Sequence, residues 1–260
     1  MELTAERLNV CYGEKLVLKD VSFNINNGEI ATFIGPNGSG KSTIIKTVSG
    51  FLKPAGGSVY LNKVNMGKIK TKDIAKNVAV LPQIKMVPSD INVEELVTNG
   101  RYPHLRFGRR LEKEDREIVS WALEKTGLFE IKDRYVATLS GGERQRAWIA
   151  MSLAQKPKML LLDEPTTFLD ICYQLEVLEL VKELNETLGI TVVMVLHDLN
   201  QAARYSDKLL VVNNGELCES GDPLNVVTKE LLKNIFRIDA DIYEDKIHKC
   251  PYFIPKKITE

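Results

Sequence analysis

The pattern of apolar and polar positions predicts a chain that combines strands with helices. Residues 8–25 alternate apolar and polar side chains around a Tyr-Gly break, which is typical of two antiparallel strands. Residues 29–35 and 190–198 each contain a largely apolar run, as buried parallel strands do. A helix is expected directly after the first of these runs, at residues 41–52. Further short strands are expected at residues 56–62, 77–83 and 158–163.

A segment with helical spacing interrupts this pattern. Residues 92–102 and 112–128 have helical periodicity, with no evident strand between them. Another helix is expected at residues 170–189, where Gly189 is a natural C-terminal stop. Its apolar positions recur at roughly helical intervals at Ile171, Leu175, Leu178 and Leu188. An Asn-Gly pair within residues 208–221 predicts a hairpin.

These elements predict an α/β fold with a mostly parallel sheet, because strands alternate with helices. An antiparallel β-subdomain is expected at the N-terminus and a helical subdomain is inserted in the core. The expected boundaries are 1–86 and 150–222 for the core with its antiparallel part, and 87–149 for the helical subdomain. Residues 223–260 form a C-terminal extension, whose last part matches no known pattern and is expected to form a small strand or to pack on the core.

Composition and charge narrow the functional classes. Lys and Arg together number 35, as do Asp and Glu, so the net charge of zero gives no indication of nucleic-acid binding. The apolar runs are much shorter than the roughly 20 residues that span a bilayer. We therefore expect a soluble chain that reaches a membrane only through a partner. The four cysteines are far apart in sequence and are expected to be free thiols.

The stretch GPNGSGKST fits the phosphate-loop pattern, and it follows a predicted strand and opens a predicted helix. Glycines let consecutive backbone N–H groups converge on phosphate oxygens. Lys41 is expected to reach the β- and γ-phosphates of ATP, and the Ser42 hydroxyl to ligate Mg²⁺. The residues expected to hold the nucleotide here are Gly35, Asn37, Gly38, Ser39, Gly40, Lys41, Ser42 and Thr43.

Two carboxylates follow a strongly apolar strand in the stretch MLLLDEP. A carboxylate at the end of a buried strand is costly unless a cation meets it, and Mg²⁺ is such a cation. Asp163 is expected to hold the ion through its water shell, and Glu164 to act as general base on the attacking water. Taken without the phosphate loop, the same pair could equally be strand-end charges that face solvent.

A second glycine motif, LSGGERQR, has no lysine. Ser140, Gly141 and Gly142 can present a hydroxyl, backbone N–H groups and a helix dipole to an anion. The same residues can form a plain helix N-terminus, with Ser140 as cap and Glu143 completing a capping box. The two interpretations are compatible.

The order of these motifs resembles that of the ATP-binding cassette (ABC) ATPases from about residue 3 to residue 223. The resemblance implies a P-loop NTPase fold with a RecA-like core. It also implies that two identical subunits close head to tail on two ATP molecules. The second glycine motif of one subunit then caps the γ-phosphate that the other subunit holds.

The resemblance also assigns four further residues. Tyr12 is similar to the aromatic residue that stacks on adenine, and Gln83 to the residue that reaches Mg²⁺ and the attacking water. His197 is similar to the histidine that contacts the γ-phosphate. Asp170 is similar to an aspartate that crosses the dimer interface, and it is also placed to cap the following helix.

Two stretches narrow the resemblance to one group of ABC ATPases. Residues 95–104 and 196–223 look like those of the ATPases of iron–siderophore, haem and cobalamin importers. Such ATPases work at the cytoplasmic face of the membrane, beneath a multi-span permease. A substrate-binding protein delivers the cargo to that permease. A soluble, non-transport ABC ATPase, such as an iron–sulfur assembly type, is the alternative. The arginines of residues 101–110 are either a contact surface for the permease or lipid headgroups, or part of a solvated loop.

Overall fold

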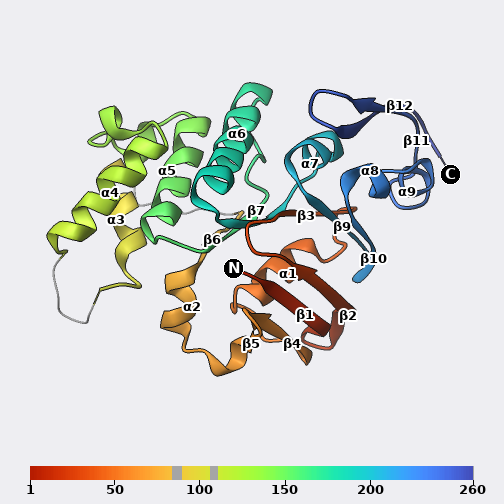
Figure 1. Cartoon of the computed structure of the whole chain (residues 1–260), viewed down its shortest axis with the longest axis horizontal. Coiled ribbons are helices and arrows are strands. Elements are labelled where there is room, and N and C mark those ends of the chain that lie inside the picture. Colours follow the sequence, from red (N-terminus) through yellow and green to blue (C-terminus); the bar gives the residue numbers. More distant parts are fainter. Residues whose placement is uncertain (84–89, 106–110, 260) are drawn as a thin grey trace. The chain divides into compact units, whose positions relative to one another are not determined.

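A computed structural model describes residues 1–83, 90–105 and 111–259 (Figure 1). The chain divides into two compact units, one formed by Met1–Lys68 with Thr191–Glu260 and the other by Ile69–Ile190. Both contain helices and strands, and parallel strand pairs occur in each. The predicted α/β class, with a separate antiparallel sheet at the N-terminus, is therefore confirmed.

The antiparallel sheet of the first unit has the strand order β2-β1-β4-β5. Its strands are β1 (Leu3–Tyr12), β2 (Lys15–Ile25), β4 (Gly56–Leu61) and β5 (Val64–Asn65). Leu3 pairs with Ile25 on one side and Leu61 on the other, and all three side chains are buried. The alternation in the sequence therefore indicates strands with one buried face, and β1 begins five residues earlier than the residues 8–25 predicted for this pair.

A largely parallel sheet in the same unit carries the phosphate-loop stretch. Its strands are β3 (Ile30–Ile34), β8 (Thr191–Val195), β9 (Lys208–Asn213) and β10 (Glu216–Gly221). β3 lies between β8 and β9 and is parallel to both, whereas β10 returns antiparallel to β9 through the predicted hairpin. All side chains of β3 and β8 are buried, which explains their continuous apolar runs. Their carboxyl ends meet at one edge of the sheet, where α1 (Lys41–Val48) begins.

The C-terminal part adds helices and a hairpin. Its elements are α7 (Leu199–Tyr205), α8 (Pro223–Val226), α9 (Lys229–Asn234), β11 (Ile238–Asp245) and β12 (Cys250–Ile258). The hairpin packs against α7 and α9 (Figure 1). The Asn200 side chain donates to the carbonyl of Phe253 and accepts from its N–H, at 3.2 and 3.0 Å. The tail is thus two paired strands fixed to the unit.

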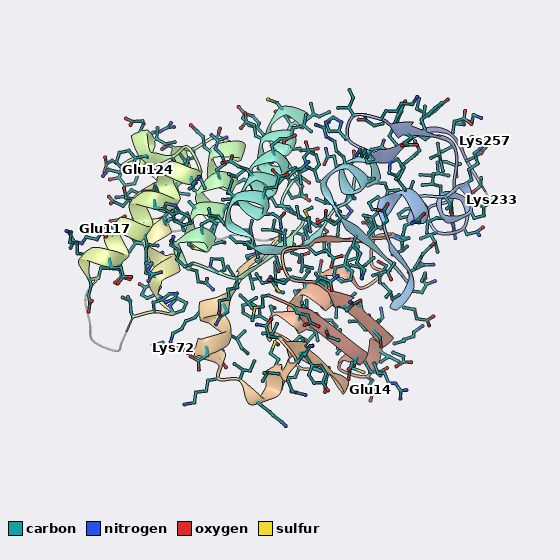
Figure 2. The ribbon with its side chains drawn as sticks, viewed as in Figure 1. Glu14, Lys72, Glu117, Glu124, Lys233 and Lys257 are labelled. Carbon is teal, nitrogen blue, oxygen red and sulfur yellow. The ribbon has the colours of Figure 1, made fainter. Side chains whose placement is uncertain are left out.

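The second unit contains the predicted helical segment. Its main elements are α2 (Thr71–Asn77), β6 (Val78–Leu81), α3 (Val93–Thr98), α4 (Lys113–Lys125), α5 (Gly141–Ala154), β7 (Met159–Asp163) and α6 (Ile171–Leu188). Short 3₁₀ turns of this unit lie at Asn99–Arg101, Phe129–Ile131 and Val136–Thr138, and one of the first unit lies at Met66–Lys68. β6 and β7 are parallel. Glu117 and Glu124 project outward from α4 (Figure 2), while Val119 and Leu123 of the same helix are buried. The helix α2 was not predicted.

The helix predicted at residues 170–189 is confirmed as α6, but of the four apolar positions that indicated it only Leu178 is buried. Ile171 is 72% exposed, and Leu175 and Leu188 are also exposed. The buried residues of α6 are Val177, Leu178, Val181 and Leu184. These four have the i, i+3/i+4 spacing of a buried helix face, and the first turn of α6 carries apolar side chains that its own unit does not cover.

A buried ion pair fastens the start of α4 to the end of α5. Arg101 donates to Asp115 at 2.9 Å and to the carbonyl of Ala154 at 2.7 Å. Nearby, Nε2 of His104 lies 2.8 Å from the carbonyl oxygen of Gln155, and burial lowers the pKa of His104. Arg101 is only 5% exposed, so both predictions for it, as part of a contact surface or of a solvated loop, are wrong. The other arginines of that stretch, Arg106, Arg109 and Arg110, lie outside the described residues.

Candidate functional site

The glycine-rich loop between β3 and α1 has a backbone that requires glycine at two points. Gly35 has a φ of 146°, and a Cβ atom there would lie 2.0 Å from the carbonyl oxygen of Val212. Gly40 has a φ of 111° and is the N-cap residue of α1. The loop therefore curls closely around the N-terminus of α1, where backbone N–H groups and the helix dipole favour an anion.

Two buried polar groups line the inside of this loop. Lys41 is 5% exposed, and its ammonium donates to the carbonyls of Gly35 and Pro36, both at 2.8 Å. The Ser39 hydroxyl is buried and finds no hydrogen-bond partner within the described chain. An unsatisfied buried hydroxyl costs about 1–3 kcal/mol, and an oxyanion ligand would remove that cost. The interior of the loop thus suits a phosphate.

The other predicted loop residues lie on its outer side or on α1. Asn37 and Gly38 are exposed, Ser42 is half-buried and Thr43 is buried. Ser42 belongs to the first turn of α1. Its hydroxyl is the kind of hard oxygen ligand that Mg²⁺ prefers.

The hairpin turn between β9 and β10 supports the loop from the side. Gly215 donates its N–H to the carbonyl of Ser39 at 3.0 Å, and its own carbonyl accepts from Lys19 at 2.8 Å. Its φ is 82°, and a Cβ atom there would lie 2.1 Å from the carbonyl oxygen of Val17. The Asn-Gly signal predicted the hairpin, but the sequence pattern did not reveal its contact with the phosphate loop.

His197 and Tyr12 belong to the same unit as the loop. The strand β8 ends beside β3, with Val195 opposite Phe33, so His197 and Gly35 leave neighbouring strands at the same edge. His197 is exposed there. Tyr12 ends β1 at the turn into β2 and is 47% exposed, which leaves its ring accessible for stacking.

The acid pair ends β7 in the second unit. Asp163 is 5% exposed and Glu164, directly after it, has a φ of 54°, which is unusual for a residue with a side chain. Gln83 follows β6, the strand parallel to β7, and its Nε2 donates to Oε2 of Glu164 at 2.5 Å. The predicted general base and the predicted Mg²⁺-reaching glutamine are therefore in direct contact.

The second glycine motif caps α5 as one of the two interpretations predicted. Ser140 accepts from the N–H of Glu143 at 3.2 Å, and the Glu143 carboxylate accepts from the N–H of Ser140 at 2.8 Å. That backbone N–H is the main cause that lowers the pKa of Glu143. Ser140 and Gly141 remain exposed at the helix tip. The capping box therefore leaves the tip accessible to an anion.

Packing explains the third residue of the motif. A Cβ atom on Gly142 would lie 2.4 Å from the ring of Tyr173 in α6. Gly142 thus lets α5 and α6 approach closely. Asp170 occupies the N-cap position of α6, but its side chain makes no capping hydrogen bond, so the predicted capping role is wrong in that respect. The Asp170 carbonyl accepts the first backbone bond of the helix from the N–H of Gln174 at 3.0 Å.

The comparisons with known proteins identify the family. The family model described as ABC transporter matches residues 18–167. The chain belongs to the ABC transporter family and is an ATP-binding, ATP-hydrolysing subunit.

Relatives and solved structures agree with this assignment. The chain is 49% identical to the iron(3+)-hydroxamate import ATP-binding protein FhuC of Bacillus subtilis, over 94% of this chain and 90% of the relative. It is 46% identical to the petrobactin import ATP-binding protein FpuC of Bacillus anthracis, with 99% and 94% coverage. It is 43% identical to the ferric enterobactin transport ATP-binding protein FepC of Escherichia coli, with 97% and 93% coverage.

Among solved structures, an inward-facing metal-chelate type ABC transporter superposes with a TM-score of 0.85 at 28% identity, over 98% of this chain and 97% of that one. The ATP-binding cassette MJ0796, dimeric and bound to ADP and Pi, superposes with a TM-score of 0.73 at 28% identity, with 85% and 98% coverage. The predicted family, fold class and ATPase activity are confirmed. The roles of individual site residues stay predictions.

Proposed function

We propose that the chain is the nucleotide-binding subunit of an importer that uses ATP to take up an iron–siderophore complex through a membrane permease. The observation that carries this proposal is the 49% identity to an iron–hydroxamate import protein over 94% of the chain. The named relatives favour a siderophore over the haem and cobalamin that the sequence left open. None of the described helices is both long and apolar enough to cross a bilayer. The subunit would bind peripherally, at the cytoplasmic face of the permease.

ATP would bind to the phosphate loop, with its adenine on Tyr12. The Lys41 ammonium, which now donates to the Gly35 and Pro36 carbonyls, would turn to the β- and γ-phosphates. The buried Ser39 hydroxyl supports this proposal because it needs a partner. His197, at the same sheet edge, would contact the γ-phosphate.

The residues proposed for Mg²⁺ offer the ligands that this ion prefers. Ser42 supplies a hydroxyl, Asp163 a buried carboxylate, and Gln83 an amide oxygen, all of them hard oxygen donors. When bound, Mg²⁺ would neutralise charge on the phosphate oxygens. Asp163 would act on it through water.

Glu164 would accept the proton of the attacking water. It directly follows the buried strand β7, and its carboxylate accepts a hydrogen bond from Gln83. A general base must lie within hydrogen-bond reach of the proton that it takes, and a fixed carboxylate meets that condition better than a mobile one.

Two copies would close head to tail on two ATP molecules. The exposed tip at Ser140 and Gly141 would cap the γ-phosphate held by the partner copy, and Asp170 would cross the interface. Next to this tip, Phe168 is 98% exposed and Ile171 is 72% exposed. Large apolar side chains of this kind are typical of a surface that a partner covers. The dimer would drive a multi-span permease, to which a substrate-binding protein delivers the cargo.

The central experiment compares three variants in ATP hydrolysis and ATP binding. Lys41→Ala should lose ATP binding, and Glu164→Gln should bind ATP but hydrolyse it poorly and accumulate an ATP-bound dimer in size-exclusion chromatography. Ser140→Arg should bind ATP but fail to dimerise, because a large cation fills the capping tip. Hydrolysis at the parent rate by Glu164→Gln would exclude Glu164 as the base.

Transport itself needs a separate experiment. The chain purified from native membranes should bring with it a multi-span protein, and reconstituted hydrolysis should rise with a ferric siderophore and its binding protein. Recovery with a soluble iron–sulfur scaffold instead would favour an assembly-type ATPase.

A further inference from the structure

Two donors converge on one oxygen of the Glu164 carboxylate. Gln83 donates through Nε2 to Oε2 at 2.5 Å, and the Thr167 hydroxyl donates to the same Oε2 at 3.1 Å. The first residue was expected near the base because of the family resemblance. Thr167 was not singled out from the sequence, although it follows Glu164 by three positions in the stretch DEPTTFLD.

The two donors differ in how they are tied to the base. Gln83 lies 81 residues away in sequence and belongs to the segment that follows β6. Thr167 belongs to the same turn as Glu164, since its N–H also donates to the Glu164 carbonyl at 3.4 Å. A contact within one turn persists when neighbouring segments move, whereas the contact with Gln83 depends on where its own segment lies.

The conformation of this turn is specific. Glu164 has a φ of 54°, and such a backbone costs energy unless surrounding contacts hold it. The Thr167 side chain and backbone bonds both close the turn onto Glu164, and Thr167 is half-buried. The hydroxyl therefore fixes the direction of a carboxylate whose backbone is already constrained.

This arrangement matters most in the ATP-bound state of the proposed function, on which the inference rests. If the Gln83 amide binds Mg²⁺ and the attacking water, its hydrogen bond to Glu164 is no longer its only interaction in the site. The Thr167 hydroxyl can keep its bond to Oε2 throughout. A side chain held by a second group reaches its proton more often in a productive geometry.

We propose that Thr167 is a positioning residue for the general base: its hydroxyl holds Oε2 of Glu164 and so orients the carboxylate toward the attacking water. Its contribution is to the rate of hydrolysis. It makes no contribution to ATP affinity or to closure of the dimer.

The test is a set of substitutions of similar volume. Thr167→Val removes the hydroxyl and keeps the branched shape, and it should lower kcat about 10- to 100-fold, as expected for a lost hydrogen bond to a charged group. The KM for ATP and the ATP dissociation constant should stay within about twofold of the parent values. Thr167→Ser restores a hydroxyl and should recover most of kcat.

Two controls separate positioning from a structural role. Thr187→Val is the same substitution at an exposed site of α6, where the hydroxyl donates to the Glu183 carbonyl at 2.7 Å, and it should leave kcat unchanged. In the Glu164→Gln background, Thr167→Val should still allow the ATP-bound dimer to accumulate in size-exclusion chromatography.

Three results would overturn the inference. They are a Thr167→Val variant with the parent kcat, a Thr167→Ser variant as slow as Thr167→Val, and a raised ATP dissociation constant or lost dimer in Thr167→Val. An unmodified chain that fails to hydrolyse ATP would instead overturn the proposed function, and this inference with it.

Discussion

Removing the Asp115 carboxylate should destabilise the helical unit more than any surface change. The side chains of Arg101 and Asp115 are only 7% and 11% exposed, and they form a 2.9 Å ion pair. Asp115 also accepts from the N–H of Glu112 at 3.0 Å and so completes the capping box of α4. Asp115→Ala therefore strands a buried guanidinium and removes a cap at the same time.

The expected loss follows from these two contacts. Stranding one member of a buried ion pair costs about 3–5 kcal/mol, and losing a helix cap costs about 1 kcal/mol. Arg101 keeps its bond to the Ala154 carbonyl, which moderates the first figure. A loss of about 3–5 kcal/mol is a large fraction of the roughly 5–15 kcal/mol that stabilises a typical domain.

Urea unfolding followed by tryptophan fluorescence suits this measurement. The chain has two tryptophans, Trp121 on α4 and Trp148 on α5, so the signal reports the unit that contains the ion pair. Lys113→Ala is the matched control, because its ion pair with Glu117 joins side chains that are 92% and 65% exposed. That control should change the free energy of unfolding by less than about 0.5 kcal/mol.

A double substitution distinguishes a stranded charge from lost packing. Arg101→Met combined with Asp115→Ala removes both charges and should be more stable than Asp115→Ala alone, because no ion is then buried unpaired. If the single variant loses less than about 1 kcal/mol, or if the double variant is the less stable of the two, the ion pair does not hold these helices together.

Three further predictions concern pH and two glycines. Burial alone would raise the pKa of Asp115, but the Glu112 N–H and the Arg101 guanidinium outweigh it and hold that pKa below its ordinary value. The resulting stability is present above pH ~4 and is lost as the pH falls through the folded-state pKa. The difference in free energy of unfolding between the parent and Asp115→Asn should therefore narrow in acid, and a difference that stays constant with pH would contradict this. Gly215→Ala should weaken ATP binding at least about tenfold by calorimetry, since its Cβ meets the Val17 carbonyl at 2.1 Å and shifts the turn that supports the phosphate loop; unchanged affinity would show that the turn is not needed. Gly142→Ala should lower the free energy of unfolding, measured in urea, by about 1–3 kcal/mol through its 2.4 Å overlap with the Tyr173 ring, and a smaller residue at position 173 should restore it.

The sequence predicted those features that depend on local pattern. Continuous apolar runs located β3 and β8, and the glycine spacing located the loop at the N-terminus of α1. The spacing of apolar residues also located α6, but apolar residues such as Ile171 in its first turn are exposed, so the spacing did not give its buried face. The periodicity of a helix does not distinguish a side chain that faces the core from one that faces another subunit.

Contacts between distant segments could not be predicted from pattern. The bond from Gln83 to Glu164 joins residues 81 positions apart, and the bond from Gly215 to Ser39 joins a hairpin turn to the phosphate loop. Each depends on strand order in a sheet, which one sequence does not specify. For the tail, the expected strand and the packing on its unit are found, but the pairing of β11 with β12 and the contacts with α7 and α9 were not predicted.

Several polar groups of the site are hydrogen-bonded within the chain. Lys41 donates to loop carbonyls, Glu164 accepts from Gln83, and Ser140 exchanges hydrogen bonds with Glu143. These internal bonds hold the side chains of the loop and the helix tip in defined orientations. When ATP binds, these hydrogen bonds within the chain would be replaced by hydrogen bonds to ATP. Tight binding would therefore require a ligand that replaces all of them. A nucleotide without the γ-phosphate would replace fewer of these hydrogen bonds. It should therefore bind to the phosphate loop, while Gln83 stays bonded to Glu164 and no phosphate contacts the helix tip at Ser140.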